Sequence, residues 1–437
     1  MRPKQVITKI MVATAISLIA LASCSSGSGD GPKGESGADA TLKSLTVSAG
    51  TLTPAFSPTR TEYTVNLETS QTTLTVTGVA TDANATVGGK SGAAQTIKAG
   101  ETAIVVSVTG SDGKTTKDYT VKANRKPNVY TAGRLTENGK TYASFWKNAE
   151  RTLLDIGDST SGVAEAITVA NGTVYAAGYC YETIGGSSVP VPCYWTGTTR
   201  TKLAGDGTHE AYAFAIAVDG GNVYAAGYYS NGTTKIPCYW KNENRIDLPG
   251  IYYEAIAISI SGGKVYVAGF EYDGNDPCYW INGDKTSLGN SGLTNTRPKA
   301  MIIDGNDIYI GGRANNGSSY VPCLWVNGAR TLLPLGSATS INVSGMAVMN
   351  GKAYICGQGT INSKDTACYW ADSTNTALSD SNASETDANC ITSFNGTLYT
   401  GGRANVSLPY TACYWIGTTR VDLSTSYSEV NAIFVGD

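Results

Sequence analysis

Seven tryptophans recur in register over most of the chain, and they constrain the fold more than any other feature. They are all the tryptophans of the protein: Trp146, Trp195, Trp240, Trp280, Trp325, Trp370 and Trp415. Successive tryptophans are 49, 45, 40, 45, 45 and 45 residues apart. A repeat of this length is one supersecondary unit that buries its apolar face only by stacking against its neighbours. The tryptophans therefore predict seven copies of one unit, with the tryptophans in the structural core.

Two more columns of identical residues follow the same register. The tyrosines are Tyr130, Tyr175, Tyr224, Tyr266, Tyr309, Tyr354 and Tyr399, and the glycines are Gly133, Gly178, Gly227, Gly269, Gly312, Gly357 and Gly402. The third copy contains four strand-like segments, VYAAG, PCYW, RIDL and EAIAISI. Four short strands in 40 to 50 residues are typical of one propeller blade, and no segment shows the 3.6-residue period of a helical repeat. Residues 128–437 are therefore predicted to form a seven-bladed β-propeller.

The register also predicts how the ring closes. The repeat unit begins at Val129, on a strand of the tyrosine column, and it ends on an isolated strand of the other type, Asn431 to Val435. We expect this last strand to complete the blade begun by residues 128–155, because a ring closed by its own ends leaves no free sheet edge. The repeat resembles those of uncharacterised lipoproteins from spirochaetes and other bacteria, a likeness that implies no activity.

Residues 41–126 alternate apolar and polar side chains in short runs between turn signals, which predicts antiparallel strands packed on one face. About seven such strands in this length indicate a β-sandwich, so the whole chain is expected to be all-β. The unit resembles the bacterial cadherin-like β-sandwich domain, through Leu42-x-x-Leu45-x-Val47, through Gly50-x-Leu52-x-Pro54-x-Phe56-Ser57-Pro58 leading to Tyr63, and through Asp112-Gly113 leading to Tyr119 and Arg125. The resemblance implies a spacer or interaction module. Calcium adhesion is not expected, since no cluster of carboxylates accompanies it.

The start of the chain has the pattern of a bacterial lipoprotein signal. Arg2, Lys4 and Lys9 precede an apolar run that is too short to span a bilayer. The run ends in Leu21-Ala-Ser-Cys24, which resembles a lipobox and implies removal of residues 1–23 and lipidation of Cys24. The alternative is an ordinary secretory signal with a chance cysteine. Residues 24–40 are then a flexible tether, because they are too poor in apolar groups to fold.

Export and anchoring set the expected location and partners. Ser25 after the lipidated cysteine resembles outer-membrane usage, so we expect a protein held in the cell envelope, in the outer membrane, by its lipid. Without residues 1–23 the chain carries 29 Lys and Arg against 35 Asp and Glu, a net charge of −6. This charge disfavours a nucleic-acid partner, which requires a basic face. An unknown protein or glycan is the expected ligand.

The cysteines are more consistent with packing than with chemistry. One column stands two residues before each tryptophan, with Ser144 in the first copy: Cys193, Cys238, Cys278, Cys323, Cys368 and Cys413. Residues two apart in a strand share a face, so each cysteine should pack beside its tryptophan. Cys180 is the exception, since it could reach Cys193 across its hairpin and form a disulfide. The single histidine, His209, lacks neighbours suited to a metal, so neither a metal nor a cofactor is expected.

Tight turns are expected on one face of the ring, at Asp219-Gly220-Gly221 and, after the tryptophan, at Lys241-Asn242. The other two connections of each copy vary in length, and variable loops on a rigid scaffold commonly bind ligands. At the edge of that face the residue after the column glycine is Arg134, Tyr179, Tyr228, Phe270, Arg313, Gln358 or Arg403. These seven residues would form a polar arc and an aromatic arc, which could clamp a carboxylate and stack a sugar. The alternative is that they pack between blades.

No catalytic constellation stands out. There is no Gly-x-Ser-x-Gly elbow, phosphate loop or metal-ligand spacing, and His209 is accompanied only by Asp206 and Glu210. The chain is therefore predicted to be a non-catalytic binding module rather than an enzyme. A structural envelope scaffold is the main alternative. A carboxylate-dependent glycan-active enzyme is a weaker one, which two acidic side chains about 5–9 Å apart in a central cleft would favour.

Overall fold

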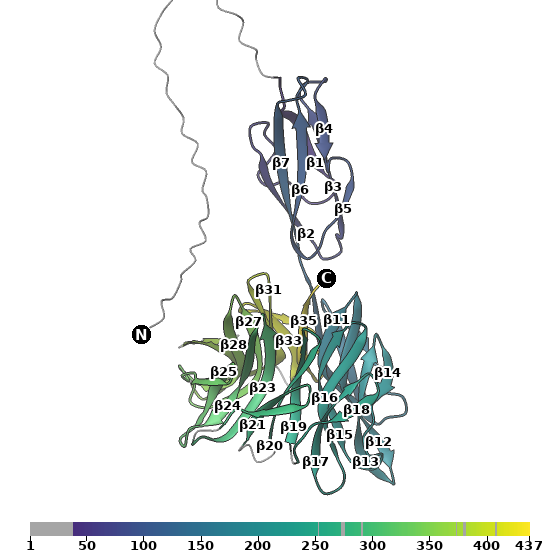
Figure 1. Cartoon of the computed structure of the whole chain (residues 1–437), viewed down its shortest axis with the longest axis vertical. Coiled ribbons are helices and arrows are strands. Elements are labelled where there is room, and N and C mark those ends of the chain that lie inside the picture. The colour runs from purple at the N-terminus through teal and green to yellow at the C-terminus, as the bar shows by residue number, and fades with distance from the viewer. Residues whose placement is uncertain are drawn as a thin grey trace, which may run out of the picture.

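The computed structural model describes residues 38–437 except 252, 272–275, 290–291, 373, 379–381 and 407–408. Every regular element in these residues is a β-strand, and a search of them finds no helix that could cross a membrane. The strands form a small body, β1 to β7, and a larger one, β8 to β35 (Figure 1). The predicted signal, the lipidation site Cys24 and all but residues 38–40 of the predicted tether lie outside the described residues.

The small body is a sandwich of two sheets, one in the order β1-β3-β5 and the other in the order β2-β7-β6-β4. Its strands are β1 (Leu42–Val47), β2 (Glu62–Leu67), β3 (Thr73–Ala80), β4 (Thr86–Gly89), β5 (Ala94–Thr96), β6 (Gly100–Thr109) and β7 (Thr116–Arg125). The expectation of purely antiparallel strands is wrong at one place, because β2 and β7 pair in parallel. The alternation itself does not distinguish the two directions of pairing, since both place every second side chain on the core face.

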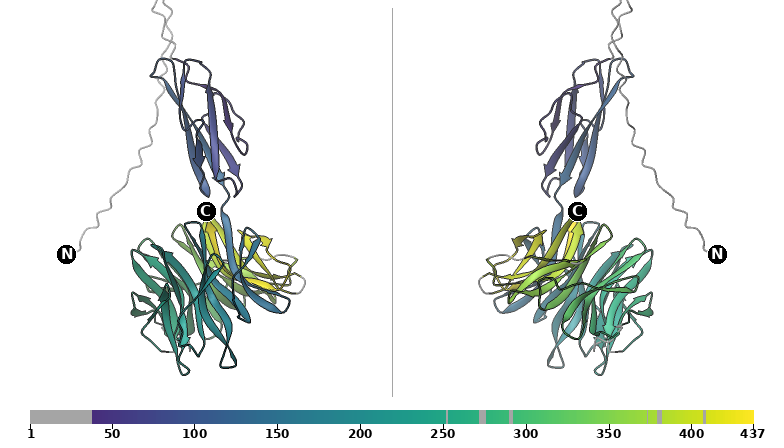
Figure 2. Two further views of the ribbon diagram at one scale, coloured as in Figure 1. Left: turned by 90° about the vertical axis from the view of Figure 1, so that its right-hand side faces the viewer. Right: turned by 90° about the vertical axis from the view of Figure 1, so that its left-hand side faces the viewer.

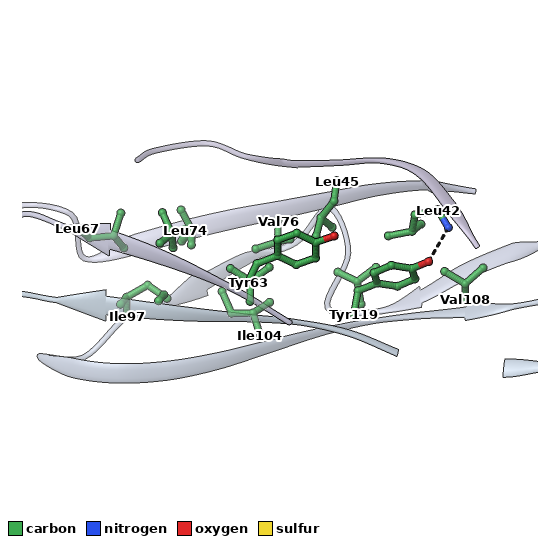
Figure 3. Packing of buried hydrophobic residues seen from close by; sticks show 14 of the residues in the cluster. Leu42, Leu45, Tyr63, Leu67, Leu74, Val76, Ile97, Ile104, Val108 and Tyr119 are labelled. Carbon is green, nitrogen blue, oxygen red and sulfur yellow. Dashed lines mark hydrogen bonds between the residues drawn. The ribbon is translucent and has the colours of Figure 1, made fainter. Parts of the chain in front are cut away.

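Two tyrosines of the sequence motif connect the strands of the sandwich to its loops. The Tyr63 hydroxyl donates to the carbonyl of Ser57 at 2.8 Å, and the Tyr119 hydroxyl donates to the carbonyl of Pro58 at 2.8 Å. The backbone N–H of Leu42 donates to the Tyr119 hydroxyl at 3.1 Å, a bond drawn in Figure 3. Both rings are buried among aliphatic side chains of the two sheets (Figure 3). Each buried hydroxyl thus has partners, which removes the cost of desolvating it.

The larger body repeats four kinds of strand, named here by their order from the centre outward. The inner strands are β11 (Ser161–Ala170), β15 (Ala211–Asp219), β19 (Tyr253–Ser261), β23 (Thr294–Asp304), β27 (Ile341–Met349), β31 (Glu385–Phe394) and β35 (Ser428–Gly436). The second strands are β12 (Thr173–Ile184), β16 (Asn222–Ser230), β20 (Lys264–Glu271), β24 (Asp307–Asn315), β28 (Lys352–Ile361), β32 (Thr397–Asn405) and β8 (Asn128–Glu137).

The remaining strands lie farther out in the same sheets. The third strands are β13 (Ser187–Thr196), β17 (Lys235–Lys241), β21 (Pro277–Ile281), β25 (Tyr320–Val326), β29 (Lys364–Ala371), β33 (Thr411–Ile416) and β9 (Lys140–Lys147). The outer strands are β14 (Thr199–Lys202), β18 (Asn244–Asp247), β22 (Asp284–Ser287), β26 (Ala329–Leu332), β30 (Thr374–Ala377), β34 (Thr419–Asp422) and β10 (Glu150–Leu153). Within each sheet, neighbouring strands are joined by antiparallel pairing from inner to outer.

The two ends of the larger body meet in one sheet. Strand β35 pairs antiparallel with β8, from Ser428 opposite Leu135 to Gly436 opposite Asn128. Strands β9 and β10 continue this sheet, and a single bridge from Thr141 to Ser161 joins it to the sheet that starts at β11. Each inner strand also contacts the next one, in the order β11, β15, β19, β23, β27, β31, β35 and back to β11.

The tryptophan column lies between neighbouring sheets. All seven indoles are at most 1% exposed, and the six cysteines of the adjacent column are fully buried. Trp240, for example, packs with Cys238 of its own sheet and with Ala177 and Tyr194 of the preceding sheet. Its indole N–H donates to the carbonyl of Ala204 at 2.9 Å. The repeated tryptophan therefore fills the space between two sheets, and in four copies (Trp195, Trp240, Trp280 and Trp370) its N–H also holds the loop that enters its own sheet.

The two faces of the larger body differ in their connections. Two-residue turns join inner to second strands and third to outer strands on one face, as after Asp219 and Lys241. The opposite face, called here the hairpin face, carries the other connections. The expectation that these connections are loops of variable length is wrong in part, because the extra length of the second copy is strand. Strand β12 has twelve residues and ends in the two-residue turn Gly185-Gly186, where both glycines have positive φ. Such a turn extends a hairpin without adding a loop.

The sandwich adjoins the two-residue-turn face, where β8 begins and β35 ends (Figures 1 and 2). Arg125 of β7 is buried, and its guanidinium donates to the carbonyls of Ile97 at 3.0 Å and Thr69 at 2.9 Å. The third partner of the guanidinium is the carboxylate of Asp437, which also accepts from the backbone N–H of Ala99 at 2.7 Å. The residue after β35 therefore connects the propeller-like body to the sandwich.

Candidate functional site

Each inner strand has a β-bulge at the same position of the repeat. The pairing with the second strand skips one residue there, between Ala164 and Ala166 in β11 and at the equivalent place in the others. The skipped residues, called here the bulge ring, are Glu165, Phe214, Ile256, Lys299, Ser344, Asn389 and Asn431. A bulge releases one residue from the ladder and can re-aim its side chain.

The bulge explains the column of glycines in the second strands. A Cβ atom on Gly227 would stand 1.8 Å from the carbonyl oxygen of Tyr212. Tyr212 lies on the inner strand, two residues before the bulge at Phe214. The same clash occurs at all seven column glycines, where the distance to the inner-strand carbonyl is between 1.8 and 2.2 Å. None of these glycines has a positive φ. Their role is therefore to admit the close approach of a neighbouring backbone, a common use of glycine in a strand.

The bulge ring surrounds a cavity of about 390 Å³ at the centre of the larger body. All seven of its residues line the cavity, and so do Glu254, Asn342 and Glu429, which stand two residues earlier in their inner strands. Only Phe270 and Arg403 of the predicted column line it. Each inner strand begins at the hairpin face, so residues that precede the bulge lie nearer to that face. The cavity therefore extends from the bulge ring toward the hairpin face.

Three residues of the predicted polar arc are ion-paired or hydrogen-bonded to inner strands. The Nε atom of Arg134 lies 2.8 Å from Oε1 of Glu429. Arg403 bridges two carboxylates, with Nε 2.6 Å from Oδ2 of Asp387 and Nη1 3.1 Å from Oε2 of Glu429. Gln358 donates a hydrogen bond to Asp387. These contacts hold the Glu429 carboxylate between two guanidinium groups at the wall of the cavity.

The fourth residue of the polar arc lies in a group of positive charges. Nη1 of Arg313 donates to Oδ1 of Asn342 at 2.7 Å, and its guanidinium lies 4.5 Å from the centroid of the Tyr320 ring. Burial lowers the pKa of Lys299 in the bulge ring, and the nearby charges of Arg313 and Arg297 lower it further. Three cationic side chains thus stand close together on β23 and β24.

The predicted aromatic arc packs mainly between two sheets. The ring of Tyr212 contacts Tyr179 at 4.7 Å and Tyr228 at 5.3 Å between centroids. Tyr228 is 4% exposed, and its hydroxyl donates to Glu210 at 3.1 Å. Phe214 stacks on Tyr212 at 5.7 Å and reaches the cavity from the bulge ring. Stacking on a ligand is therefore open to Phe214, whereas Tyr179 and Tyr228 serve packing, and so does Phe270, which is only 2% exposed.

Glu165 is the acidic residue of the bulge ring. Burial, with a smaller contribution from the charge of Glu429, raises the pKa of its carboxyl to about 7. Arg134, the hydroxyl of Tyr179 and Lys299 act in the opposite direction and do not compensate. Near neutral pH the group is thus poised to exchange a proton, either as a hydrogen-bond donor or as a carboxylate.

His209 stands away from this cavity. Its Nδ1 lies 2.5 Å from Oδ2 of Asp206 in the loop between β14 and β15, where the imidazole is exposed. This contact belongs to a local turn in which Asp206 also accepts from the N–H groups of Thr208 and His209. No group of three His, Cys, Asp or Glu side chains suited to a metal occurs in the part of the chain that the structure describes.

Cys180 and Cys193 are free thiols in the structure, with their Sγ atoms 3.8 Å apart. Both are buried, on paired strands β12 and β13. The hydrogen bond from Cys193 and the charge of Arg200 lower the pKa of Cys180, whereas burial raises that of Cys193. The disulfide that the sequence left open is absent here, although the two sulfurs are neighbours.

Sequence reasoning missed the bulge ring, and the signal for it was present. Each of its residues precedes a small residue of the inner strand: Ala166, Ala215, Ala257, Ala300, Gly345, Cys390 or Ala432. Charged and amide side chains recur directly before this small column, inside otherwise apolar strands. A buried strand rarely carries such residues unless they are paired or face a cavity. The predicted column stood one strand too far from the centre.

Comparisons with known proteins give distant structural likenesses over most of the chain and one family match in the sandwich. The most similar solved structures include the computationally designed Ika8 protein, at 13% identity over 64% of this chain and 94% of that one, with a TM-score of 0.37. Pyrococcus horikoshii acylaminoacyl peptidase aligns at 10% identity over 75% of this chain with a TM-score of 0.43, and this chain covers 52% of its length. The β-propeller domain of the Trilobed protease from Pyrococcus furiosus aligns at 9% identity over 76% and 94%, with a TM-score of 0.42.

These likenesses are too distant to inform function. No curated protein matches the sequence. One family model does match, and it covers residues 42–126, the span of the sandwich: the cadherin-like beta sandwich domain.

Proposed function

We propose that the chain is a non-catalytic binding protein that takes up its ligand, part of a glycan or protein, in the central cavity from the hairpin face. One observation carries the proposal. Seven inner strands each release one side chain from the ladder, and all seven line one cavity of about 390 Å³. Concave sites with a few convergent polar groups are the usual form of a ligand pocket.

The binding body is proposed to be a seven-bladed β-propeller closed by β35. The closed cycle of contacts among the inner strands supports this architecture. So does the pairing of β35 with β8, which would place the first and last segments of the repeat in one blade. A ring closed in this way keeps the bulge residues at fixed positions around the cavity.

The chain is also proposed to be exported and lipidated at Cys24 after removal of residues 1–23, and to be held in the outer membrane. The sequence pattern of the first 24 residues supports this proposal. The sandwich would then act as a spacer between the tether and the propeller. Because the sandwich adjoins the two-residue-turn face, the hairpin face points away from the sandwich (Figure 1). Labelling with radioactive palmitate, compared between the wild type and Cys24→Ser, tests the anchor.

A cavity-filling variant tests the binding function. Ser344 belongs to the bulge ring, where other blades carry phenylalanine or isoleucine, so Ser344→Phe should fill the cavity without disturbing the sheet. Ser187→Phe adds the same side chain at an exposed position on the hairpin face and is the matched control. Glycan arrays and pull-downs from matrix material should give ligands that the wild type and Ser187→Phe capture and Ser344→Phe does not. Equal capture by all three proteins would contradict a cavity site and favour a scaffold.

A glycan-cleaving enzyme is the second candidate, and one observation favours it. Glu165, a carboxyl with a raised pKa, shares the cavity with Glu429, a carboxylate paired with two arginines. A protonated acid beside an ionised carboxylate is the arrangement that glycosidases use. Release of reducing ends from captured glycans, abolished by Glu165→Gln, would support catalysis over binding alone.

A further inference from the structure

The cavity contains charged residues of two kinds, those with an ion-pair partner and those without one. Glu254 is paired with Lys235, with Nζ and Oε1 2.8 Å apart. Glu429 and Arg403 belong to the network described above. Glu165 and Lys299, by contrast, form no ion pair with any residue that the structure describes. The protein therefore leaves one acidic and one basic side chain of this cavity without a charged partner.

These two residues occupy equivalent positions on opposite sides of the ring. Both are bulge residues, Glu165 on β11 and Lys299 on β23. In the cycle of inner-strand contacts, β23 is three strands from β11 in one direction and four in the other, the largest separation that seven strands allow. Each charge influences the pKa of the other, but the two side chains do not pair with each other. The space between them is the cavity.

The surroundings keep the two ends of the cavity different in charge. Arg297 and Arg313 stand near Lys299, so this wall has an excess of positive charge that favours an anionic group. Glu429 and Arg134 stand near Glu165, but Glu429 is paired with Arg134 and Arg403, so Glu165 is the acidic group of that wall left for a cationic group or a hydroxyl. Phe214 and Ile256 line the side between β11 and β23 and offer an apolar surface to the part of a ligand that joins its ends. Burying two charges without partners is costly, and a ligand that brings both partners removes that cost.

From this arrangement we propose that the cavity binds a small zwitterion, or a zwitterionic end of a larger molecule, with its carboxylate on Lys299 and its ammonium group on Glu165. The inference rests on the proposed binding function and specifies the class of ligand for the same site. It makes Lys299 and Glu165 the residues that determine specificity, and it assigns the column residues Arg134 and Arg403 to positioning Glu429.

A set of matched probes tests the class of ligand on the full mature protein. The probes are ω-amino acids from glycine to 8-aminooctanoate, with hexanoate and hexylamine as analogues of 6-aminohexanoate that each lack one charge. Isothermal titration calorimetry at pH 7.5 should show one chain length bound best and at least about tenfold more tightly than either analogue, the effect of one charged hydrogen bond. Equal affinity for the zwitterions and their one-charge analogues, or no binding of any probe, would overturn the proposal.

Two variants separate the ends of the site. Glu165→Gln should weaken the zwitterion about tenfold and leave hexanoate unchanged, whereas Lys299→Gln should weaken both. Glu150→Gln and Lys264→Gln, at exposed positions outside the cavity, are the matched controls and should change neither affinity. Thermal melts identify any variant that fails to fold. In that case the series of ω-amino acids measured on the wild type tests the proposal by itself. A Lys299→Gln variant that binds hexanoate like the wild type contradicts the assignment of the anionic end.

The result also distinguishes this inference from the proposed function. If Ser344→Phe abolishes capture of a ligand but the probes show no preference for two charges, the cavity binds ligands and the zwitterion proposal is wrong. If the zwitterion binds through Glu165 and Lys299 while capture from matrix material is insensitive to Ser344→Phe, the cavity is a small-molecule site and the proposed macromolecular function is wrong.

Discussion

The carbonyl oxygen of Tyr212 lies 1.8 Å from the place where Gly227 would carry a Cβ atom. No side chain fits there, because the obstacle is backbone and is itself fixed by the β-bulge at Phe214. The glycine and the bulge therefore depend on each other. The bulge sends a side chain toward the cavity, and the glycine on the next strand makes room for the carbonyl that the bulge displaces.

Gly227→Ala should consequently destabilise the larger body strongly. The added methyl group forces the inner strand away from the second strand, and we expect a loss of about 3 kcal/mol in the free energy of unfolding. Urea unfolding followed by tryptophan fluorescence measures this loss. Gly205→Ala is the control, since its Cβ would meet only Ala211 at 3.4 Å. Similar stability of the two variants would show that the bulge is free to open.

These glycines also show what the sequence could and could not predict. The columns of tryptophan, tyrosine and glycine revealed the repeat, because a residue needed for packing recurs wherever the packing recurs. The bulge ring varies from glutamate to lysine to phenylalanine, since its side chains face a cavity and no repeated packing constrains them. The position of the bulge ring could be read from the small residue that follows each of its members. The direction of its side chains could not, because it depends on a skipped pairing that the period-two pattern does not show. The parallel pairing of β2 with β7 escaped for a similar reason.

If β35 closes the proposed propeller, deleting residues 429–437 should unfold the larger body rather than shorten it. This segment is almost the whole of β35, whose Val430 and Val435 are buried and whose backbone pairs with β8. Without it, β8 has an open edge and two inner strands lose a neighbour. We expect the cooperative thermal transition seen by circular dichroism to disappear, whereas deletion of residue 437 alone should preserve it. A retained cooperative melt in the longer deletion would refute closure by β35.

The stability of the larger body should depend on pH through Glu165. Its folded-state pKa of about 7 lies above the ordinary value of 4.5, so the folded protein holds this proton more tightly than the unfolded chain. The stabilising contribution is present below pH 4.5 and is lost as the pH rises to about 7. Glu165→Gln should remove this dependence and make the protein about 2–3 kcal/mol more stable than the wild type at pH 8.

Chemical denaturation at pH 5, 6, 7 and 8 measures the difference between the two proteins. Arg134, Tyr179, Glu429 and Lys299 influence the same carboxyl, and all of them are present in both proteins. The comparison therefore isolates Glu165. A constant difference in stability across this range would be inconsistent with a raised pKa at this position.

Asp437→Ala should loosen the sandwich from the larger body. The carboxylate accepts from Arg125 and from the N–H of Ala99, two groups of the sandwich. Asp437 is partly exposed, so we expect a cost of only about 1 kcal/mol, which corresponds to about 5 °C in the melting of the sandwich. Differential scanning calorimetry should resolve two transitions that lie farther apart than in the wild type. Lys126→Ala, which removes an exposed ion pair with Glu68, is the control and should leave both transitions unchanged.

Mild oxidation should join Cys180 to Cys193. Their sulfurs are already neighbours, and a disulfide would close a loop of about a dozen residues and stabilise the protein by about 2–3 kcal/mol. Peptide mapping by mass spectrometry should find this bond and no other among the column cysteines. Cys180→Ala should be inert to the same treatment. Recovery of both thiols in reduced form after complete oxidant exposure would show that burial protects them.

The bulge ring also bears on how such a protein diversifies. A bulged residue takes no part in the pairing of its strand, so exchanging it alters the contents of the cavity without disturbing the interfaces between sheets. Seven positions contributed by seven copies can therefore change one at a time, each within an otherwise uniform unit. A lineage that duplicates this unit therefore keeps a stable frame, and it can change the chemistry of the cavity by substituting any of the seven bulge residues.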